Sequence, residues 1–292
     1  MATAVPALRR ADQILRLLCA EPGRALTVSA MAAASGMPKA TCFAQLACLA
    51  ELGWVEREES SKTYRPGPEL VHLGWASIEQ VPGVDVARRE MFALTERLDV
   101  GCFACRLVGT DMVILDRAGA ESREFDLPSL DALRVPATPP LGSVYFAWSP
   151  QPVIDDWLAR VGGTAGAPEF EAHRRALAAI RARGYSIGGG MEVALQVEQL
   201  IERIGRSSAS ERLELAITVA DLVRGAPGGQ HAEYPVTHLI APAFDAAGRV
   251  VLTLTIVGRP GQVNGGNVEN FARPLLASLG RVTAAIGGRR PA

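Results

Sequence analysis

About the first seventy residues carry an apolar pattern typical of three short helices. A stripe at helical spacing predicts a first helix that ends near Pro22. Thr27 is a good N-cap for a second helix, and Gly36 closes that helix with a left-handed turn. Pro38 suits the first position of a third helix, because its missing N–H is not needed there. The stripe of the first helix comprises Leu8, Ala11, Ile14, Leu15 and Leu18, and that of the third comprises Cys42, Leu46 and Leu49.

The segment after the third helix predicts a two-stranded hairpin. Residues 54–58 and 62–66 have the composition of short strands, and a polar turn joins them. Two helices around a glycine turn, followed by a hairpin, are typical of a winged helix-turn-helix, which lays its second helix into the major groove of DNA. On the pattern alone, any three-helix unit with a hairpin explains these residues equally well.

From residue 69 onwards the pattern changes to a mixture of helices and strands. Residues 69–79 predict a linker helix, and Pro82 and Gly83 follow it. Further helices are expected at about 87–98, 149–162, 170–184 and 271–286, and strands at 101–108, 112–117, 238–244 and 250–257. Since strands and helices do not alternate regularly, we expect an antiparallel sheet flanked by helices. The predicted fold class is therefore α+β.

Composition and charge exclude some classes of protein. The chain is 48% hydrophobic and 21% charged, which is typical of a soluble globular protein. It has no secretory signal and no apolar run long enough to span a membrane, so we expect a cytoplasmic protein without a membrane partner. The five cysteines form no disulfide framework. The net charge is −1, so any contact with DNA must come from the local placement of basic side chains.

The run GMPKATCFAQLACLAELGWVEREESSKTYRPGPELVHLG resembles the DNA-binding domain of IclR-type transcriptional regulators. The family usually has a Pro-Lys-Ser-Thr motif, a leucine-rich helix, Leu-Gly-Tyr and a wing. The resemblance implies that Lys39, Thr41 and Arg65 contact DNA, together with Phe43 and Gln45. Lys39 and Arg65 would neutralise phosphates, and Phe43 could touch a thymine methyl or pack within the domain. Alanines at 40 and 44 replace the serine and arginine that are usual there, so fewer side chains can read base edges directly than is usual in the family.

Four later patches resemble the effector-binding domain of the same family, which is similar to the GAF fold. They are VGTDMVILDR, VPATPPLGSVYFAW, IRARGY and IAPAFDAAGRVVLTLTIVG. We therefore predict a winged helix-turn-helix at 1–68, a linker helix at 69–83 and an effector-binding domain at 84–292. About 190–230 forms an insertion relative to the family pattern, in which two peripheral helices are expected at 192–204 and 210–222.

By the same resemblance, two groups of residues bound an effector pocket. One is the loop of Pro139, Pro140, Leu141 and Gly142, and the other is the set His238, Thr255 and Val257. Prolines and valine donate no side-chain hydrogen bond, so the site suits a small carboxylate poorly. We expect a mostly apolar or aromatic effector anchored by His238 and Thr255. Alternatively, Leu141 and Val257 fill the space and no ligand binds.

Other combinations of reactive residues support no further chemistry. Cys102 and Cys105 form a lone CxxC, but residues three apart on a strand point to opposite faces. Gly188 to Gly190 lack a following lysine, so we predict a flexible turn rather than a phosphate loop. Asp116, Ser143 and His238 lie in no motif of a catalytic triad.

The sequence thus predicts a homodimeric or tetrameric transcriptional regulator, a repressor, that binds double-stranded operator DNA under the control of a small effector. No cofactor or metal is expected. Two alternatives stay open. One is a hydrolase or transferase fused to a DNA-binding module, and the other is an interaction protein with a degenerate helix-turn-helix that does not bind DNA.

Overall fold

The computed structural model describes residues 5–20, 23–119, 134–161, 168–189, 235–259 and 261–291. The chain forms two compact units, Met1–Gln80 and Val81–Ala292. The insertion expected at about 190–230 lies outside the described residues, and so do the two helices predicted within it. No described helix is long and apolar enough to cross a membrane.

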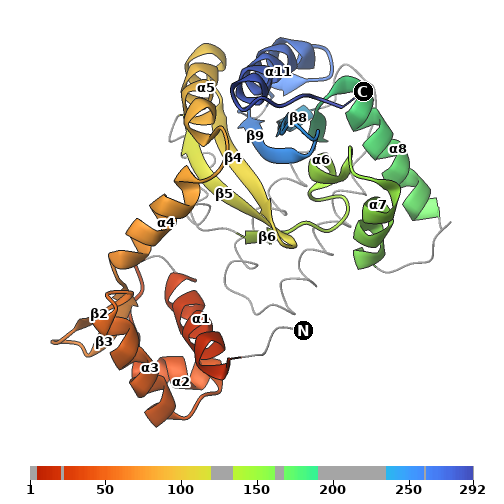
Figure 1. Cartoon of the computed structure of the whole chain (residues 1–292). Helices are drawn as coiled ribbons and strands as arrows, with labels where there is room; N and C mark the ends of the chain where they lie inside the picture. Colours follow the sequence, from red (N-terminus) through yellow and green to blue (C-terminus); the bar gives the residue numbers. More distant parts are fainter. Residues whose placement is uncertain are drawn as a thin grey trace. The chain divides into compact units, whose positions relative to one another are not determined.

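The first unit contains the predicted helices and hairpin (Figure 1). Its elements are α1 (Pro6–Cys19), β1 (Leu26–Thr27), α2 (Val28–Ser35), α3 (Lys39–Glu51), β2 (Val55–Glu58), β3 (Thr63–Pro66) and α4 (Glu69–Glu79). The apolar stripes of α1, α2 and α3 meet in one core, which the hairpin closes through Val55 and Tyr64. The buried members of this core are Ile14, Leu18, Met31, Cys42, Leu46, Leu49, Val55 and Tyr64. The winged helix-turn-helix prediction is therefore confirmed as a fold.

Local sequence signals set the ends of these helices. The amide of Ala30 donates to Oγ1 of Thr27 over 3.2 Å, which is the predicted N-cap of α2. Gly36 ends α2 at φ +69°, in the left-handed region that glycine adopts without a Cβ penalty. Pro38 lies one position earlier than expected, since it precedes α3 as the N-cap. Strand β1 was not expected, because two residues are too few to show a period.

The second unit is built on an antiparallel seven-stranded sheet. Its strands are β4 (Gly101–Val108), β5 (Asp111–Ala118), β6 (Arg134–Pro136), β7 (Ser186–Gly189), β8 (Pro235–Phe244), β9 (Val250–Val257) and β10 (Val263–Asn264). The order is β10-β8-β9-β4-β5-β6, and β7 also pairs with β8. The predicted hairpins β4–β5 and β8–β9 form its centre.

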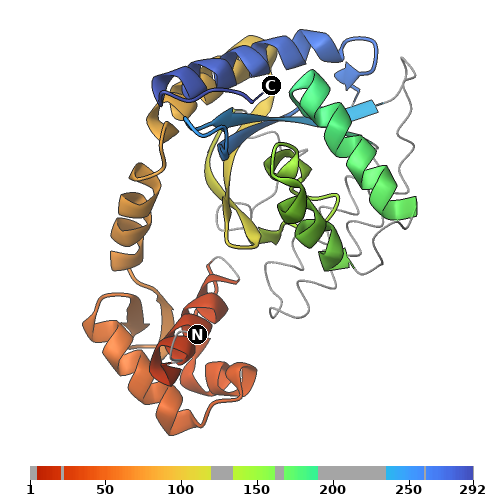
Figure 2. The same ribbon diagram turned by 45° about the vertical axis from the view of Figure 1, so that its right-hand side comes forward.

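Helices cover both faces of this sheet (Figures 1 and 2). One face packs against α5 (Val84–Leu98) and α11 (Val268–Ala285), which also contact each other. The opposite face carries α6 (Ser143–Phe146), α7 (Gln151–Leu158), a 3-10 turn (Ala159–Val161) and α8 (Pro168–Arg183). Tyr145 of α6 reaches the sheet, where its Oη lies 3.0 Å from Oγ1 of Thr253. The α+β class is confirmed, with the helices on the two faces of an antiparallel sheet.

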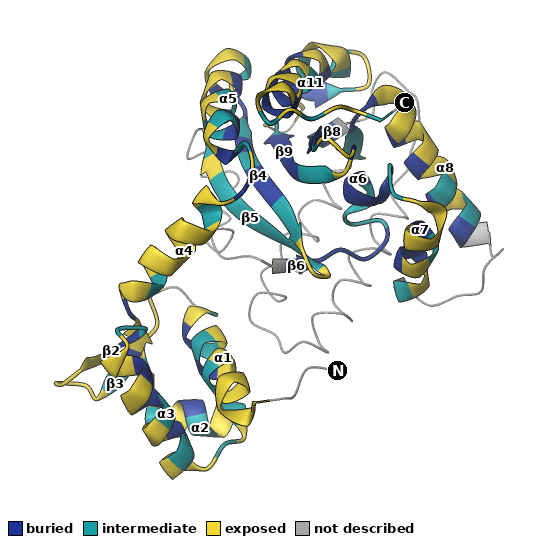
Figure 3. Cartoon of the chain, viewed as in Figure 1, coloured by how far each residue is buried: buried dark blue, intermediate teal, exposed yellow. Residues whose placement is uncertain are grey.

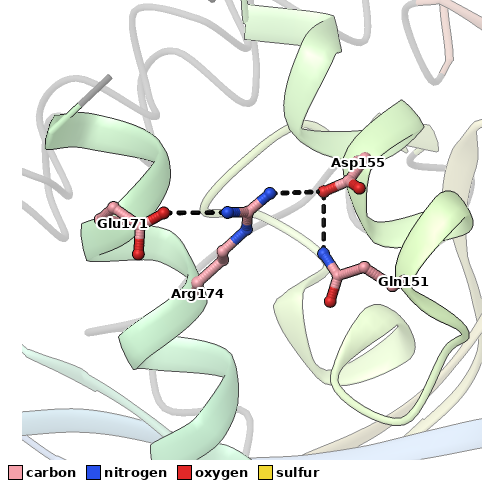
Figure 4. Close-up of polar contacts among 4 residues, drawn as sticks. All are labelled: Gln151, Asp155, Glu171 and Arg174. Carbon is pink, nitrogen blue, oxygen red and sulfur yellow. Dashed lines mark hydrogen bonds and ion pairs between the residues drawn. The ribbon is translucent and has the colours of Figure 1, made fainter. Parts of the chain in front are cut away.

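A polar cluster joins α7 to α8 (Figure 4). Arg174 of α8 donates through Nη2 to Oδ1 of Asp155 over 2.8 Å, and through Nη1 to Glu171 over 2.9 Å. Gln151 donates to the same oxygen of Asp155 over 2.8 Å. The Arg174 guanidinium holds the pKa of the Asp155 carboxyl below its ordinary value. In the same layer of helices, Trp157 of α7 stacks on Phe146 of α6 with the ring centres 4.7 Å apart.

One prediction of local structure is wrong. Gly188 does not belong to a flexible turn, because it lies within strand β7 opposite His238 of β8. A Cβ at position 188 would lie 1.9 Å from Cε1 of His238. Glycine is therefore needed at this position because the imidazole ring lies so close to the backbone of β7, and not because the backbone turns there.

Candidate nucleic-acid interface and effector pocket

The candidate interface with DNA centres on α3, the second helix of the helix-turn-helix. Its buried stripe, Cys42, Leu46 and Leu49, faces the core of the first unit. Lys39 is exposed at the first position of the helix, and Phe43 is 52% exposed one turn later. Thr41 and Gln45 are half-buried on the flank between the exposed side and the core. Lys39 and Phe43 are thus better placed for a large partner than Thr41 and Gln45.

Over its first three turns, the side of α3 opposite the core is made of small apolar residues. Ala40, Ala44 and Ala47 are exposed there, at spacings of three and four that place them on one face. Reasoning from the sequence noted two of these alanines only as departures from a family pattern. The helical period was the signal that could have identified them as one continuous surface, since they lie opposite the predicted core stripe.

Arg65, expected to neutralise a phosphate, has a partner within the protein. Strand register places Arg65 of β3 opposite Glu56 of β2. Nη2 and Nε of Arg65 lie 2.7 Å and 2.8 Å from Oε2 of Glu56. Since both side chains are largely solvent-exposed, the pair is weak, but it offsets the positive charge that a phosphate would meet. Among the described residues, Lys39 and Lys62 have no such ion pair.

The strand residues predicted to line an effector pocket lie on the sheet face that carries α6. Thr253 points to this face, since it contacts Tyr145, and Thr255 and Val257 alternate onto the same face. His238 lies directly opposite Val257 in the β8–β9 register. The structure therefore brings His238, Thr255 and Val257 together on neighbouring strands, and Thr255 is buried there.

His238 is held as a neutral side chain. Burial lowers its pKa from 6.5 to about 4, although part of its surface still meets solvent. Its Nδ1 lies 3.1 Å from Oγ1 of Thr237, which in turn donates to the carbonyl of Gly188 over 3.3 Å. No described residue forms a hydrogen bond with Nε2. At neutral pH the ring can therefore offer one polar contact to a ligand but no positive charge.

The loop Pro139–Gly142 borders a different part of the same domain. Pro139 is buried, whereas Pro140, Leu141 and Gly142 are half-buried. A Cβ at Gly142 would lie 3.6 Å from Sδ of Met112, so this end of the loop lies beside β5. His238 lies on β8, with β9 and β4 between it and β5. That both groups line one pocket stays a prediction.

The structure does not bring Asp116, Ser143 and His238, the residues considered for a catalytic triad, together in one site. Asp116 pairs with Ala104 across the sheet and binds Nε of Arg88 on α5 over 2.5 Å. It therefore lies on the face opposite His238. The hydroxyl of Ser143 donates to the carbonyl of Pro140. Cys102 and Cys105 pair with Ile256 and Thr253, which lie on opposite faces of the sheet, as the strand period predicted.

Comparison with known proteins places the first unit in a family. Residues 7–59 match the model of the IclR helix-turn-helix domain. The N-terminal domain is an IclR helix-turn-helix. No curated protein matches the chain by sequence. The predicted resemblance is thus confirmed in the domain that carries α3 and the wing.

Solved structures extend the likeness of fold to the whole chain. An IclR transcriptional regulator from Alicyclobacillus acidocaldarius is 19% identical with a TM-score of 0.66, covering 98% of this chain and 100% of that one. HmgR from Pseudomonas aeruginosa is 22% identical with a TM-score of 0.63, at 98% and 100% coverage. An IclR homologue from Microbacterium hydrocarbonoxydans, complexed with 4-hydroxybenzoate, is 18% identical with a TM-score of 0.66, at 96% and 99% coverage. The chain therefore has the two-domain fold of IclR-type transcriptional regulators.

Proposed function

We propose that the protein is a DNA-binding transcriptional regulator, acting as a repressor in the cytoplasm, whose affinity for an operator changes when a small molecule occupies the second unit. The observation that carries this proposal is the IclR helix-turn-helix, with Lys39 and Phe43 exposed on its second helix. The fold of the second unit, shared with IclR-type regulators, supports the sensing role.

Selection of bound duplexes from a random 30-base-pair library tests this function. We expect enrichment of one sequence, bound with a steep dependence on salt because phosphate contacts release counterions. A matched protein with Lys39→Ala should bind all duplexes more weakly. Recovery of no duplex would contradict the proposal and favour the interaction protein with a degenerate helix-turn-helix.

For the effector, we propose a mostly apolar or aromatic molecule anchored by His238 and Thr255. Support comes from the neutral state of His238, since a small carboxylate that loses its hydration needs a cation or several donors. The structural neighbour complexed with 4-hydroxybenzoate shows that this fold accommodates an aromatic ring in at least one protein. The loop Pro139–Gly142 would complete the pocket.

Calorimetry tests the effector class with 4-hydroxybenzoate, benzoate and glyoxylate as probes. We expect the two aromatic probes to bind more tightly than glyoxylate because of their apolar rings, and His238→Ala to weaken their binding by about tenfold, the loss of one hydrogen bond. Val153→Ala, a change at an exposed position on α7, serves as the control. Tight binding of glyoxylate that His238→Ala leaves unchanged would contradict the proposal. Release of a reaction product without DNA would instead support the enzyme alternative.

We further propose self-association, as a dimer or a dimer of dimers. Helix α4 has no buried residue along its length (Figure 3). Its Val71, Leu73 and Trp75 are 60%, 43% and 52% exposed, a concentration of apolar surface that a monomer rarely leaves open to water. Sedimentation of the chain and of Val71→Glu tests this: we expect a dimer or larger for the former and dissociation for the latter.

A further inference from the structure

Over its first three turns, the outward face of α3 carries almost no hydrogen-bonding group. In the first three turns of the helix, the face opposite the core consists of Ala40, Ala44 and Ala47, and Phe43 flanks it with half of its surface exposed. The exposed Glu51 continues this face only in the last turn. The two polar residues that could read a base edge, Thr41 and Gln45, are half-buried on the other flank. Such a face cannot discriminate base pairs by the pattern of donors and acceptors.

One group in the major groove suits this face. Thymine presents a methyl group at C5, and alanine and phenylalanine contact it favourably, whereas the other three bases present no methyl group there. Alanine side chains are short, so the backbone of α3 can lie close to the floor of the groove. Since a recognition helix contacts bases mainly through its N-terminal residues, Ala40, Phe43 and Ala44 are in the positions that matter most.

We propose that α3 recognises its operator through the methyl groups of thymines, contacted by Ala40, Phe43, Ala44 and Ala47. This rests on the proposed function, because it names how the same helix selects its DNA. The position of Lys39 favours DNA over an apolar protein as the occupant of this face. It is an exposed cation at the N-terminus of α3, and among the described residues no carboxylate pairs with it, so it is open to a phosphate beside the groove.

The thymine methyl can be removed without changing the base pairing. Thirty-base-pair duplexes of alternating dA-dT and of alternating dA-dU differ only at C5, and fluorescence anisotropy gives the affinity for each. We expect the dA-dU duplex to bind more weakly by about fourfold for each methyl group contacted. The sequence recovered from the random library, prepared with thymine or with uracil, provides the same comparison at the preferred site.

A pair of matched variants assigns the effect to this face. The double variant Ala44→Ser/Ala47→Ser places hydroxyls where the alanine side chains would contact thymine methyl groups. The ratio of the affinities for the thymine and uracil duplexes should therefore fall towards one. Ala33→Ser with Ala34→Ser makes the same change at exposed positions of α2 and should keep the preference.

The outcomes separate this inference from the function on which it rests. Equal affinity for the thymine and uracil duplexes would overturn the thymine proposal and leave DNA binding intact. A preference that the α3 variant does not reduce would overturn the assignment to this face. Failure to bind any duplex would overturn both proposals together.

Discussion

At the scale of single residues, two basic side chains of the first unit differ in their surroundings. Lys39 has no ion pair among the described residues, whereas Arg65 is held by Glu56 at 2.7 Å. A phosphate must compete with Glu56 for Arg65 but not with any described carboxylate for Lys39. Both residues were expected to neutralise phosphates, but their surroundings predict that Lys39 contributes more to DNA binding than Arg65.

Substitutions at these positions should therefore have unequal effects on DNA binding. Lys39→Ala should reduce the slope of log K against log salt by about 0.9, the value for one lost phosphate contact. Arg65→Ala should reduce it less. Glu56→Gln should increase affinity at low salt, because it frees Arg65, and the gain should vanish in the double variant with Arg65→Ala. A decrease in affinity for Glu56→Gln would show that the ion pair orients Arg65 rather than competing for it.

His238 predicts a dependence of stability on pH. The folded protein holds its pKa at about 4, below the 6.5 of an unfolded histidine, so the unfolded chain binds the proton more readily. The stabilisation is complete above pH 6.5 and is lost as pH falls towards 4. Over this range the free energy of unfolding of the second unit should fall by less than about 1.4 kcal/mol per pH unit. The full value is not expected, because the ring is partly exposed.

The variant His238→Asn should reduce the slope between pH 6.5 and 4. His72→Asn on the exposed helix α4 is the matched control. An unchanged slope in His238→Asn would assign the pH dependence in this range to other groups of the second unit.

At the scale of elements, the N-cap of α2 connects the sequence to the position of α3. Thr27 holds the first turn of α2, and α2 contacts α3 and buries Met31 in the core that both helices share. A frayed α2 would thus loosen the support of the recognition helix. Stability of the helix-turn-helix and affinity for DNA should change together.

Thr27→Ala should destabilise the first unit by about 1 kcal/mol, the usual cost of a lost N-cap. Thr27→Ser keeps the hydroxyl and should restore most of the stability. Thermal melting of the DNA-binding unit gives the measurement. Equal destabilisation by both substitutions would mean that the methyl group of Thr27, not its hydroxyl, supports α2.

Elements with local signals could be predicted, and those that depend on distant partners could not. The helices of the first unit and the central hairpins each carry their own caps, turns and apolar period. Strands β1, β6, β7 and β10 have four residues or fewer and exist because a neighbour pairs with them. The ion pair of Arg65 and the packing of His238 on Gly188 likewise arise from strand register, which no local pattern shows.

At the scale of the whole molecule, the insertion begins and ends at neighbouring points. Gly189 of β7 pairs with Val236 of β8, so the chain leaves and re-enters the sheet side by side. This agrees with the expectation that the ends of the insertion lie close together. The sheet does not require the intervening residues to close the gap, and the peripheral position of the insertion stays a prediction.

Replacing residues 190–230 with a short Gly/Ser linker should convert β7 and β8 into an ordinary hairpin. We expect a soluble chain whose second unit melts cooperatively, because surface loops tolerate large changes in length. Circular dichroism during heating gives the measurement. An unfolded product would show that the insertion supplies part of the core.

The pairing of Gly189 with Val236 also has a consequence for the speed of folding. The two residues lie 47 positions apart along the chain, so β7 must wait for a long loop to close before it joins β8. The β4–β5 and β8–β9 hairpins close over a few residues and can form earlier. We therefore expect β7 to join the sheet late in refolding. Until it does, the edge of β8 stays open to pairing with another chain.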